Sequence, residues 1–236
     1  MTSGTSMQII KNEFSNLENS LGCKLNYIHV KVTDIKNKAE EILSLILDDS
    51  WLTKLDDVLD KASFISRSKP TIELLETLLK EVDSKIGAEF GEILVSCSAQ
   101  SVMEDNHAHE KFPLAELWKE KAKGNPGFDF HTISPSELLF FGEAKFNSNV
   151  NSYSTAISQI CSFISKGKDL MELTDLRKLN VKVTDDHLKP NKKGYIAAFS
   201  VHNNFDEIFN VIKSNKKLRQ HLSKYPELYF IGIEVC

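Results

Sequence analysis

Two short apolar runs near the middle of the chain show the alternation expected of neighbouring β-strands. Residues 128–133 (FDFHTI) and 137–146 (ELLFFGEAKF) are separated by a turn-forming Ser-Pro-Ser sequence. Successive side chains of a strand point to opposite faces, so one face of the second run is wholly apolar. The other face begins apolar and ends in a carboxylate beside an ammonium group. That face carries Leu139, Phe141, Glu143 and Lys145.

The same alternation in the first run places Phe128 and Phe130 on one face and Asp129 and His131 on the other. If the two strands pair as a hairpin, Asp129 and Glu143 converge at one end of the sheet. Two carboxylates and a lysine on a rigid sheet can hold a hard divalent cation and a water molecule. An ordinary surface salt bridge at a strand end fits the same spacing, and the pattern alone leaves both open.

The rest of the chain alternates between helical and extended patterns, which predicts an α/β (α+β) fold with a mixed central sheet flanked by helices. We expect an N-terminal strand and a mostly helical layer over residues 1–84, packed on a core formed by residues 85–236. Further strands are predicted at 23–32, 194–201 and 228–235. Helices are predicted at 34–47, 51–62, 71–84, 86–103, 114–123, 152–166, 205–212 and 216–224.

Composition narrows the function classes. The 236 residues are 41% hydrophobic and 26% charged, with a formal net charge of −4, which argues against a simple polycationic nucleic-acid binder. The four cysteines are widely spaced, which argues against a zinc site and favours a reducing cytoplasm. No apolar run spans a membrane and no signal peptide is apparent, so we expect a cytoplasmic protein without membrane contact. Basic residues gather late in the chain, either as a solvated face or as phosphate contacts. They are Lys189, Lys192, Lys193, Lys213, Lys216, Lys217, Arg219 and Lys224.

Asp129 and, fourteen positions on, Glu143-Ala144-Lys145 resemble the motif of the PD-(D/E)XK nuclease superfamily, which includes many restriction endonucleases. The first half departs from the family pattern, because the proline, Pro126, comes three residues before the aspartate. The predicted order helix, strand, strand, helix, strand matches the superfamily's core, so residues 85–236 are expected to form a restriction-endonuclease-like core. The resemblance implies that Asp129, Glu143 and the carbonyl of Ala144 hold Mg²⁺ or Mn²⁺, and that Lys145 assists phosphodiester hydrolysis.

The first core helix of that superfamily commonly supplies a glutamate near the metal. By resemblance, Glu89 takes that place as a catalytic and metal-binding residue, although a solvated acidic residue fits equally well. Gln159 lies where some members place a glutamine facing the site, but a plain polar position is the stronger interpretation. Whether His131 belongs to the site is left open. A histidine-bearing stretch, His107 and His109, lacks the spacing of a helical zinc pair, and we expect an exposed loop there.

The helical N-terminal third and the GEAKF strand followed by a serine-rich helix are most similar to the nuclease subunit of Hachiman-type antiphage defence systems. Members of that family work with a helicase subunit. The resemblance implies a Mg²⁺-dependent deoxyribonuclease that acts on DNA as the effector of such a complex; a homo-oligomer is left open. The alternatives are a non-catalytic interaction or DNA-binding subunit with a nuclease-like fold, and a metal-dependent hydrolase of another phosphate ester.

Overall fold

The computed structural model describes residues 6–16, 22–80, 87–119, 127–202 and 204–235. Within these residues one mixed sheet of seven strands forms the centre, in the order β1-β2-β7-β6-β5-β4-β3. The strands are β1 (Met7–Asn16), β2 (Lys24–Val32), β3 (Glu110–Lys111), β4 (Phe130–Ile133), β5 (Leu139–Lys145), β6 (Lys193–Val201) and β7 (Glu227–Val235).

The sheet is parallel at its centre and antiparallel at its edges. β5, β6, β7 and β2 run parallel, whereas β1 pairs antiparallel with β2, and β4 pairs antiparallel with β5 and β3. The predicted hairpin is confirmed, with Phe130 opposite Gly142 and Ile133 opposite Leu139. The ring of Phe130 packs directly over Gly142, where a Cβ would lie 2.3 Å from the ring, so this position leaves no room for a side chain.

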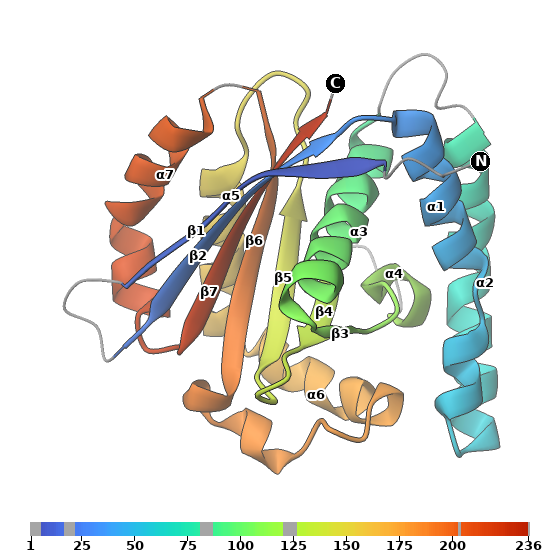
Figure 1. Cartoon of the computed structure of the whole chain (residues 1–236). Coiled ribbons are helices and arrows are strands. Elements are labelled where there is room, and N and C mark those ends of the chain that lie inside the picture. Colours follow the sequence, from blue (N-terminus) through green and yellow to red (C-terminus); the bar gives the residue numbers. More distant parts are fainter. Residues whose placement is uncertain (1–5, 17–21, 81–86, 120–126, 203, 236) are drawn as a thin grey trace.

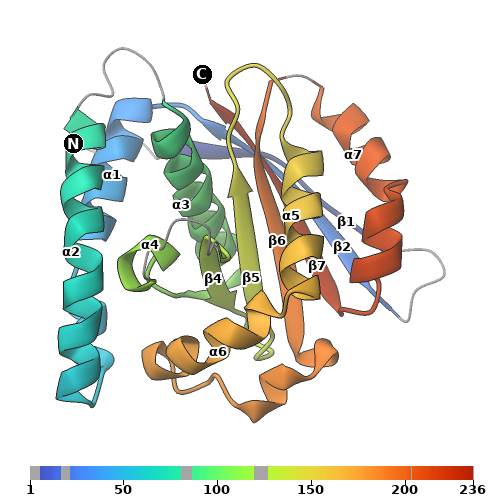
Figure 2. The ribbon, with the colours of Figure 1, turned by 180° about the vertical axis from the view of Figure 1, so that it is seen from behind.

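Helices cover both faces of the sheet (Figures 1 and 2). α3 lies against one face with α1 and α2 outside it, and α5 and α7 lie against the other. The helices are α1 (Ile35–Leu47), α2 (Val58–Lys80), α3 (Ala88–His107), α4 (Ala115–Trp118), α5 (Tyr153–Ser165), α6 (Lys168–Leu179) and α7 (Phe205–Lys213). Short helical turns occupy Ser50–Lys54, Asp185–Leu188, Pro190–Lys192 and Leu218–Leu222.

Alternation along β5 divides its side chains between two cores, as predicted. Leu139 and Phe141 join the core beneath α5 and α7, whereas Phe140 and Ala144 join the core beneath α1 and α3. The prediction that Phe128 shares a face with Phe130 is wrong. Phe128 packs in the α5 core and Phe130 in the α3 core, because β4 begins only at Phe130 and strand alternation does not reach back past Asp129.

The N-terminal third departs from prediction in two ways. α2 runs unbroken through Pro70, where two separate helices were expected. Buried Phe64, Thr71 and Leu75 lie on both sides of the proline, so packing along the helix outweighs the backbone hydrogen bond that proline cannot donate. The second departure is β1, a strand that was not predicted; the predicted strand 23–32 is confirmed as β2, which pairs with β7 in the main sheet. The boundary predicted at residue 84 lies outside the described residues.

Other differences are local. α6 follows α5 and was not foreseen. The predicted helix 216–224 is confirmed over residues 216–222, of which Leu218–Leu222 form a π-helical turn. α1 begins where predicted, because the side chain of Asp34 accepts a hydrogen bond from the backbone N–H of Asn37. The predicted helix 114–123 is seen as α4, and residues 120–123 lie outside the described part. No helix in the described ranges is long and apolar enough to cross a membrane.

Candidate functional site

The β4–β5 hairpin brings Asp129 next to the end of β5. The backbone N–H of Asp129 donates to the carbonyl of Gly142 at 2.8 Å, which continues the strand ladder by one residue. The side chain then reaches across, and its Oδ2 accepts a 2.7 Å hydrogen bond from the backbone N–H of Ala144. The aspartate is thereby fixed between Glu143 and Lys145, as the sequence predicted.

Glu143 and Lys145 lie together on the neighbouring strand. The Glu143 side chain is fully buried, and Lys145 Nζ lies 2.7 Å from its Oε1. Lys145 Nζ also donates to the carbonyl of Ala144 at 3.0 Å. Neither carboxylate oxygen of Glu143 accepts a hydrogen bond from any described residue. A buried carboxylate with so few partners is costly, and proteins commonly keep such groups where a ligand supplies what is missing.

The pKa shifts of the cluster follow from burial and from the charges that its members place close together. Burial raises the pKa of Glu143 well above its usual range, and the nearby charge of Asp129 adds to the effect. The pKa of Asp129 is raised by its own burial and then by the carboxylate of Glu116. Burial opposes the ammonium form of Lys145, but the charges of Glu143 and Asp129 outweigh it and raise its pKa. Lys145 is therefore a permanent cation at neutral pH, beside two carboxylates that compete for a proton.

Two further acidic side chains face the cluster. Glu92 on α3 lies 3.4 Å from Lys145 Nζ, and Glu116 on α4 acts electrostatically on Asp129. Glu89, which the sequence predicted for this place, lies exposed in the first turn of α3, and no ion pair joins it to Lys145 among the described residues. The prediction assumed one buried stripe on α3. The helix is instead buried around most of its circumference from Phe90 onward, and Glu92 is the residue whose side chain contacts Lys145 at the end of β5.

The cluster opens gradually toward solvent. Exposure of the side chain rises from 0% at Glu143 to 15% at Lys145 and 45% at Glu92, and Asp129 is half-buried. The arrangement therefore has a protected carboxylate at its base and an accessible rim. A cavity of about 310 Å³ lies elsewhere, beside the C-terminal half of α3, and neither Asp129 nor Glu143 lines it.

The side chains of the cluster can supply only some of the ligands of a divalent cation; the others would come from a backbone carbonyl, water or substrate. Among the described residues, no group of three or more His, Cys, Asp and Glu side chains gathers as a metal site. Mg²⁺ commonly takes one or two protein carboxylates and fills its other positions with water and substrate phosphate. Asp129, the carboxylate of Glu143 and the second lone pair of the Ala144 carbonyl meet that requirement.

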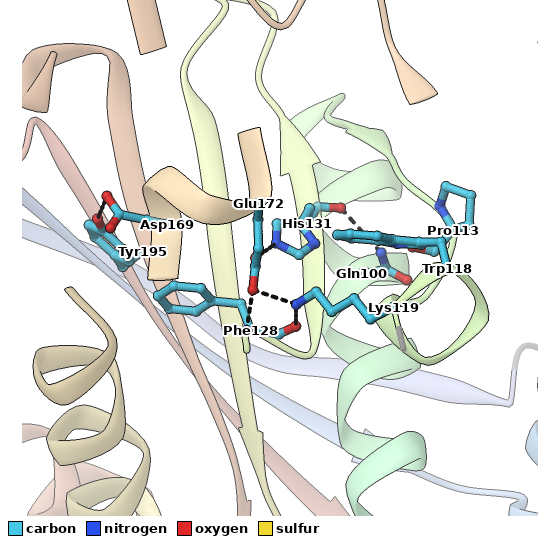
Figure 3. A network of polar contacts seen from close by, with 9 residues as sticks. All are labelled: Gln100, Pro113, Trp118, Lys119, Phe128, His131, Asp169, Glu172 and Tyr195. Atoms are coloured by element: carbon cyan, nitrogen blue, oxygen red, sulfur yellow. Dashed lines mark hydrogen bonds and ion pairs between the residues drawn. The ribbon is translucent and has the colours of Figure 1, made fainter. Parts of the chain in front are cut away.

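A second buried carboxylate, Glu172 on α6, lies against the other side of this segment (Figure 3). One of its oxygens, Oε1, accepts hydrogen bonds from the backbone N–H of Phe128 at 3.0 Å and from Lys119 Nζ at 2.6 Å. The other, Oε2, lies 2.7 Å from His131 Nε2. Lys119 Nζ also donates to the carbonyl of Phe128. Glu172 therefore contacts three hydrogen-bond donors. Two of them belong to Phe128, which precedes Asp129, and to His131, two positions after it.

The charge states in this second cluster follow from its contacts. Burial lowers the pKa of His131, so its imidazole is neutral and donates through Nε2. Burial by itself would raise the pKa of Glu172, but the hydrogen bonds from His131 and Lys119 outweigh that effect and lower it. His131 Nδ1 is buried without a hydrogen-bond partner in the described residues. His131 therefore belongs to the surroundings of Asp129 through Glu172.

Neither Glu172 nor Lys119 was predicted from the sequence. One signal was present: Gly127, beside Phe128, lacks the side chain that would block them. A Cβ at Gly127 would lie 2.2 Å from Glu172 Oε1 and 2.8 Å from Lys119 Nζ. The glycine therefore permits a close approach between the carboxylate and the backbone, but a sequence gives no means of telling which side chain makes that approach.

Other predicted residues lie away from the cluster. Gln159 on α5 is half-buried, which leaves its role untested. Lys193 is buried and pairs with Asp169 at 2.5 Å, so it does not belong to a solvated basic face. The predicted exposed loop at His109 is wrong, because that side chain is buried and its Nδ1 lies 3.0 Å from Thr132 Oγ1.

Comparison with known proteins adds no identity. No protein-family description matches the chain, and the comparison with curated proteins found no match.

Proposed function

We propose that the chain is a metal-dependent nuclease that hydrolyses DNA phosphodiester bonds on a restriction-endonuclease-like core. One observation carries the proposal: the hairpin brings Asp129, the fully buried Glu143 and the cationic Lys145 together at one strand end. The order α3, β4, β5, α5, β6, with β4 antiparallel and β6 parallel to β5, supports the same superfamily core.

Asp129 and Glu143 would hold Mg²⁺ or Mn²⁺ with the carbonyl of Ala144. Such an ion lowers the pKa of bound water and polarises a phosphate. The fully buried Glu143 fixes one side of the site, and half-buried Asp129 faces the accessible side, from which a phosphate would enter. Glu92, rather than Glu89, is placed to adjust the charge at the rim.

Lys145 supplies positive charge where the phosphorane-like transition state gathers negative charge. Its raised pKa keeps it protonated at neutral pH, so it acts as an electrostatic stabiliser and hydrogen-bond donor and not as a general base. Its position is defined by the contacts with Glu143 and the Ala144 carbonyl. The ammonium group is thus oriented before substrate arrives, which is the condition for efficient electrostatic catalysis.

The proposed function includes a helicase subunit as a partner. The net charge of −4 gives the chain little general attraction for DNA, so a helicase subunit that delivers the strand would provide what the nuclease lacks. Within this proposal the chain is the effector of a cytoplasmic antiphage defence complex. Phosphate contacts beyond the site would come from exposed late lysines such as Lys189 and Lys216.

The test is cleavage of plasmid and single-stranded DNA in Mg²⁺ or Mn²⁺ by the wild type and by Lys145→Ala. We expect metal-dependent cutting that falls about a thousandfold in the variant, because one preorganised donor to the transition state is lost. Lys111→Ala is the matched control. Lys111 is also a strand lysine paired with a glutamate of α3, Glu104 at 2.6 Å, but it lies outside the cluster.

The outcomes separate the functions. Cutting that the control retains and Lys145→Ala loses would support the nuclease and the site together. If no protein cuts DNA, either alone or with a helicase partner and ATP, the nuclease proposal fails in favour of a non-catalytic subunit. Hydrolysis of a small phosphate ester that DNA does not inhibit would instead indicate a phosphoesterase with another substrate.

A further inference from the structure

The backbone around Asp129 is anchored at three consecutive peptide groups. The Phe128 N–H donates to Glu172 Oε1 at 3.0 Å. The next peptide group accepts from Lys119 Nζ through the Phe128 carbonyl and donates to Gly142 through the Asp129 N–H. The third accepts a 3.1 Å hydrogen bond from the N–H of Ala115 through the Asp129 carbonyl. Only the Asp129–Gly142 bond belongs to the β4–β5 pairing, so the other anchors are additions to the sheet.

Two of these anchors are supplied by one charged pair. Glu172 and Lys119 contact each other at 2.6 Å, and each also holds one backbone group of Phe128 (Figure 3). Gly127 lets them approach this closely. Phe128 lies before the start of β4, where ladder hydrogen bonds no longer define the chain. The pair therefore determines the backbone conformation at the point from which the Asp129 side chain projects toward Ala144.

We propose that Glu172 and Lys119 are positioning residues for Asp129, which set the affinity of the site for its divalent cation without touching that cation. This inference rests on the proposed function, because it assumes that Asp129 is a metal ligand. Groups that orient a metal ligand from outside typically change metal affinity or activity about 10- to 100-fold when removed. Loss of the pair frees the Phe128 peptide groups, so Asp129 samples positions that no longer converge with Glu143.

The same helix provides a matched control. Asp169 lies one turn before Glu172 on α6, and it too is a buried carboxylate paired with a buried lysine, Lys193 at 2.5 Å. It also accepts a hydrogen bond from Tyr195 at 3.2 Å. Figure 3 shows Asp169 and Tyr195 apart from the Glu172 cluster. Asp169→Asn therefore removes a comparable buried charge from the same helix while the anchors of Phe128 remain.

The experiment measures Mn²⁺ binding to the full chain by calorimetry and by the electron paramagnetic resonance signal of free Mn²⁺. The wild type, Glu172→Gln and Asp169→Asn are compared at a temperature where thermal unfolding shows each to be folded. We expect Mn²⁺ affinity to fall about 10- to 100-fold in Glu172→Gln and to be unchanged in Asp169→Asn. Cleavage at saturating Mn²⁺ should recover most of the wild-type rate, because Lys145 and Glu143 are untouched.

Lys119→Met is a second variant, because a half-buried lysine is easier to replace without unfolding than Glu172. It keeps the aliphatic stem and removes the donor to the Phe128 carbonyl, and we expect its Mn²⁺ affinity to fall in the same direction. Equal affinities in Lys119→Met, Glu172→Gln and Asp169→Asn would overturn the positioning role alone. A wild type that binds no Mn²⁺ would overturn the proposed function, and this inference with it.

Discussion

Glu143 on β5 and Glu172 on α6 are both buried glutamates close to the β4–β5 hairpin, but their polar contacts differ. Glu172 has three donors for its two oxygens, and its pKa is lowered. Glu143 has an ion-pair contact with Lys145 and no hydrogen bond from the described residues, and its pKa is raised. The fold therefore stabilises the ionised form of Glu172 and destabilises the ionised form of Glu143.

This difference in polar contacts suits Glu172 to a structural role and Glu143 to ligand binding. A carboxylate whose hydrogen bonds are all made inside the protein has nothing left to offer a ligand. A carboxylate that is fully buried with few polar contacts costs stability. Such a group is retained where a bound cation or substrate compensates for that cost. Burial alone would have grouped Glu143 with Glu172, whereas the count of donors distinguishes them. The three predictions below test this contrast, in order of expected size.

The largest expected effect is on stability, with opposite signs at the two sites. Glu172→Gln should lower the free energy of unfolding by about 3 kcal/mol, because Lys119 and the Phe128 backbone lose their charged partner. Glu143→Gln in metal-free protein should raise it by about 1 kcal/mol, because a carboxyl group whose ionised form is disfavoured by burial is replaced by a neutral amide. Urea denaturation with a chelator present measures both. Equal destabilisation by the two substitutions would remove the contrast.

The second prediction concerns pH. Between the unfolded pKa of a glutamate, about 4.3, and the raised pKa of native Glu143, the native state holds a proton that the unfolded state has lost. The free energy of unfolding of the metal-free protein therefore falls as pH rises through that window, by up to about 1.4 kcal/mol per pH unit for one proton. Glu172 acts in the opposite direction: its lowered pKa gives stability above about pH 4.3 that is lost as pH falls.

Denaturation curves collected between pH 4.5 and 8 measure this slope. Glu143→Gln should reduce it, and the remainder should come from the raised pKa of Asp129. Saturating Mn²⁺ should abolish the slope in the wild type, because the cation displaces the extra protons of the native state. A wild type and a Glu143→Gln variant with the same slope would show that Glu143 keeps its ordinary pKa.

The smallest expected effect compares two glutamates on α3. Glu92→Gln should weaken Mn²⁺ binding by up to about fivefold, since Glu92 contacts Lys145 from a partly exposed position and such contacts contribute about 1 kcal/mol or less. Glu89→Gln should leave Mn²⁺ binding unchanged, because the residue is exposed in the first turn of the helix. Calorimetric titration of both variants decides between them. A loss at Glu89 equal to that at Glu92 would restore the prediction made from sequence.

The sequence by itself determined the hairpin and the faces of β5, because alternation of apolar side chains is a local property and both cores select the same register. It also determined that Asp129, Glu143 and Lys145 meet, since two paired strands leave few geometries for residues at their ends. The start of α1 at Asp34 was likewise local, because a side-chain cap is made within one turn.

Tertiary structure decided the rest. Which glutamate of α3 reaches the hairpin depends on the angle at which the helix crosses the sheet, and a helix buried around most of its surface has no single stripe from which to infer it. The continuity of α2 through Pro70 depends on packing along its whole length. The hold of Glu172 and Lys119 on the Phe128 backbone joins residues distant in the chain, with only the missing side chain of Gly127 to mark it. Contacts of this kind leave no periodic pattern, because they are made once, between side chains that only the complete fold brings together.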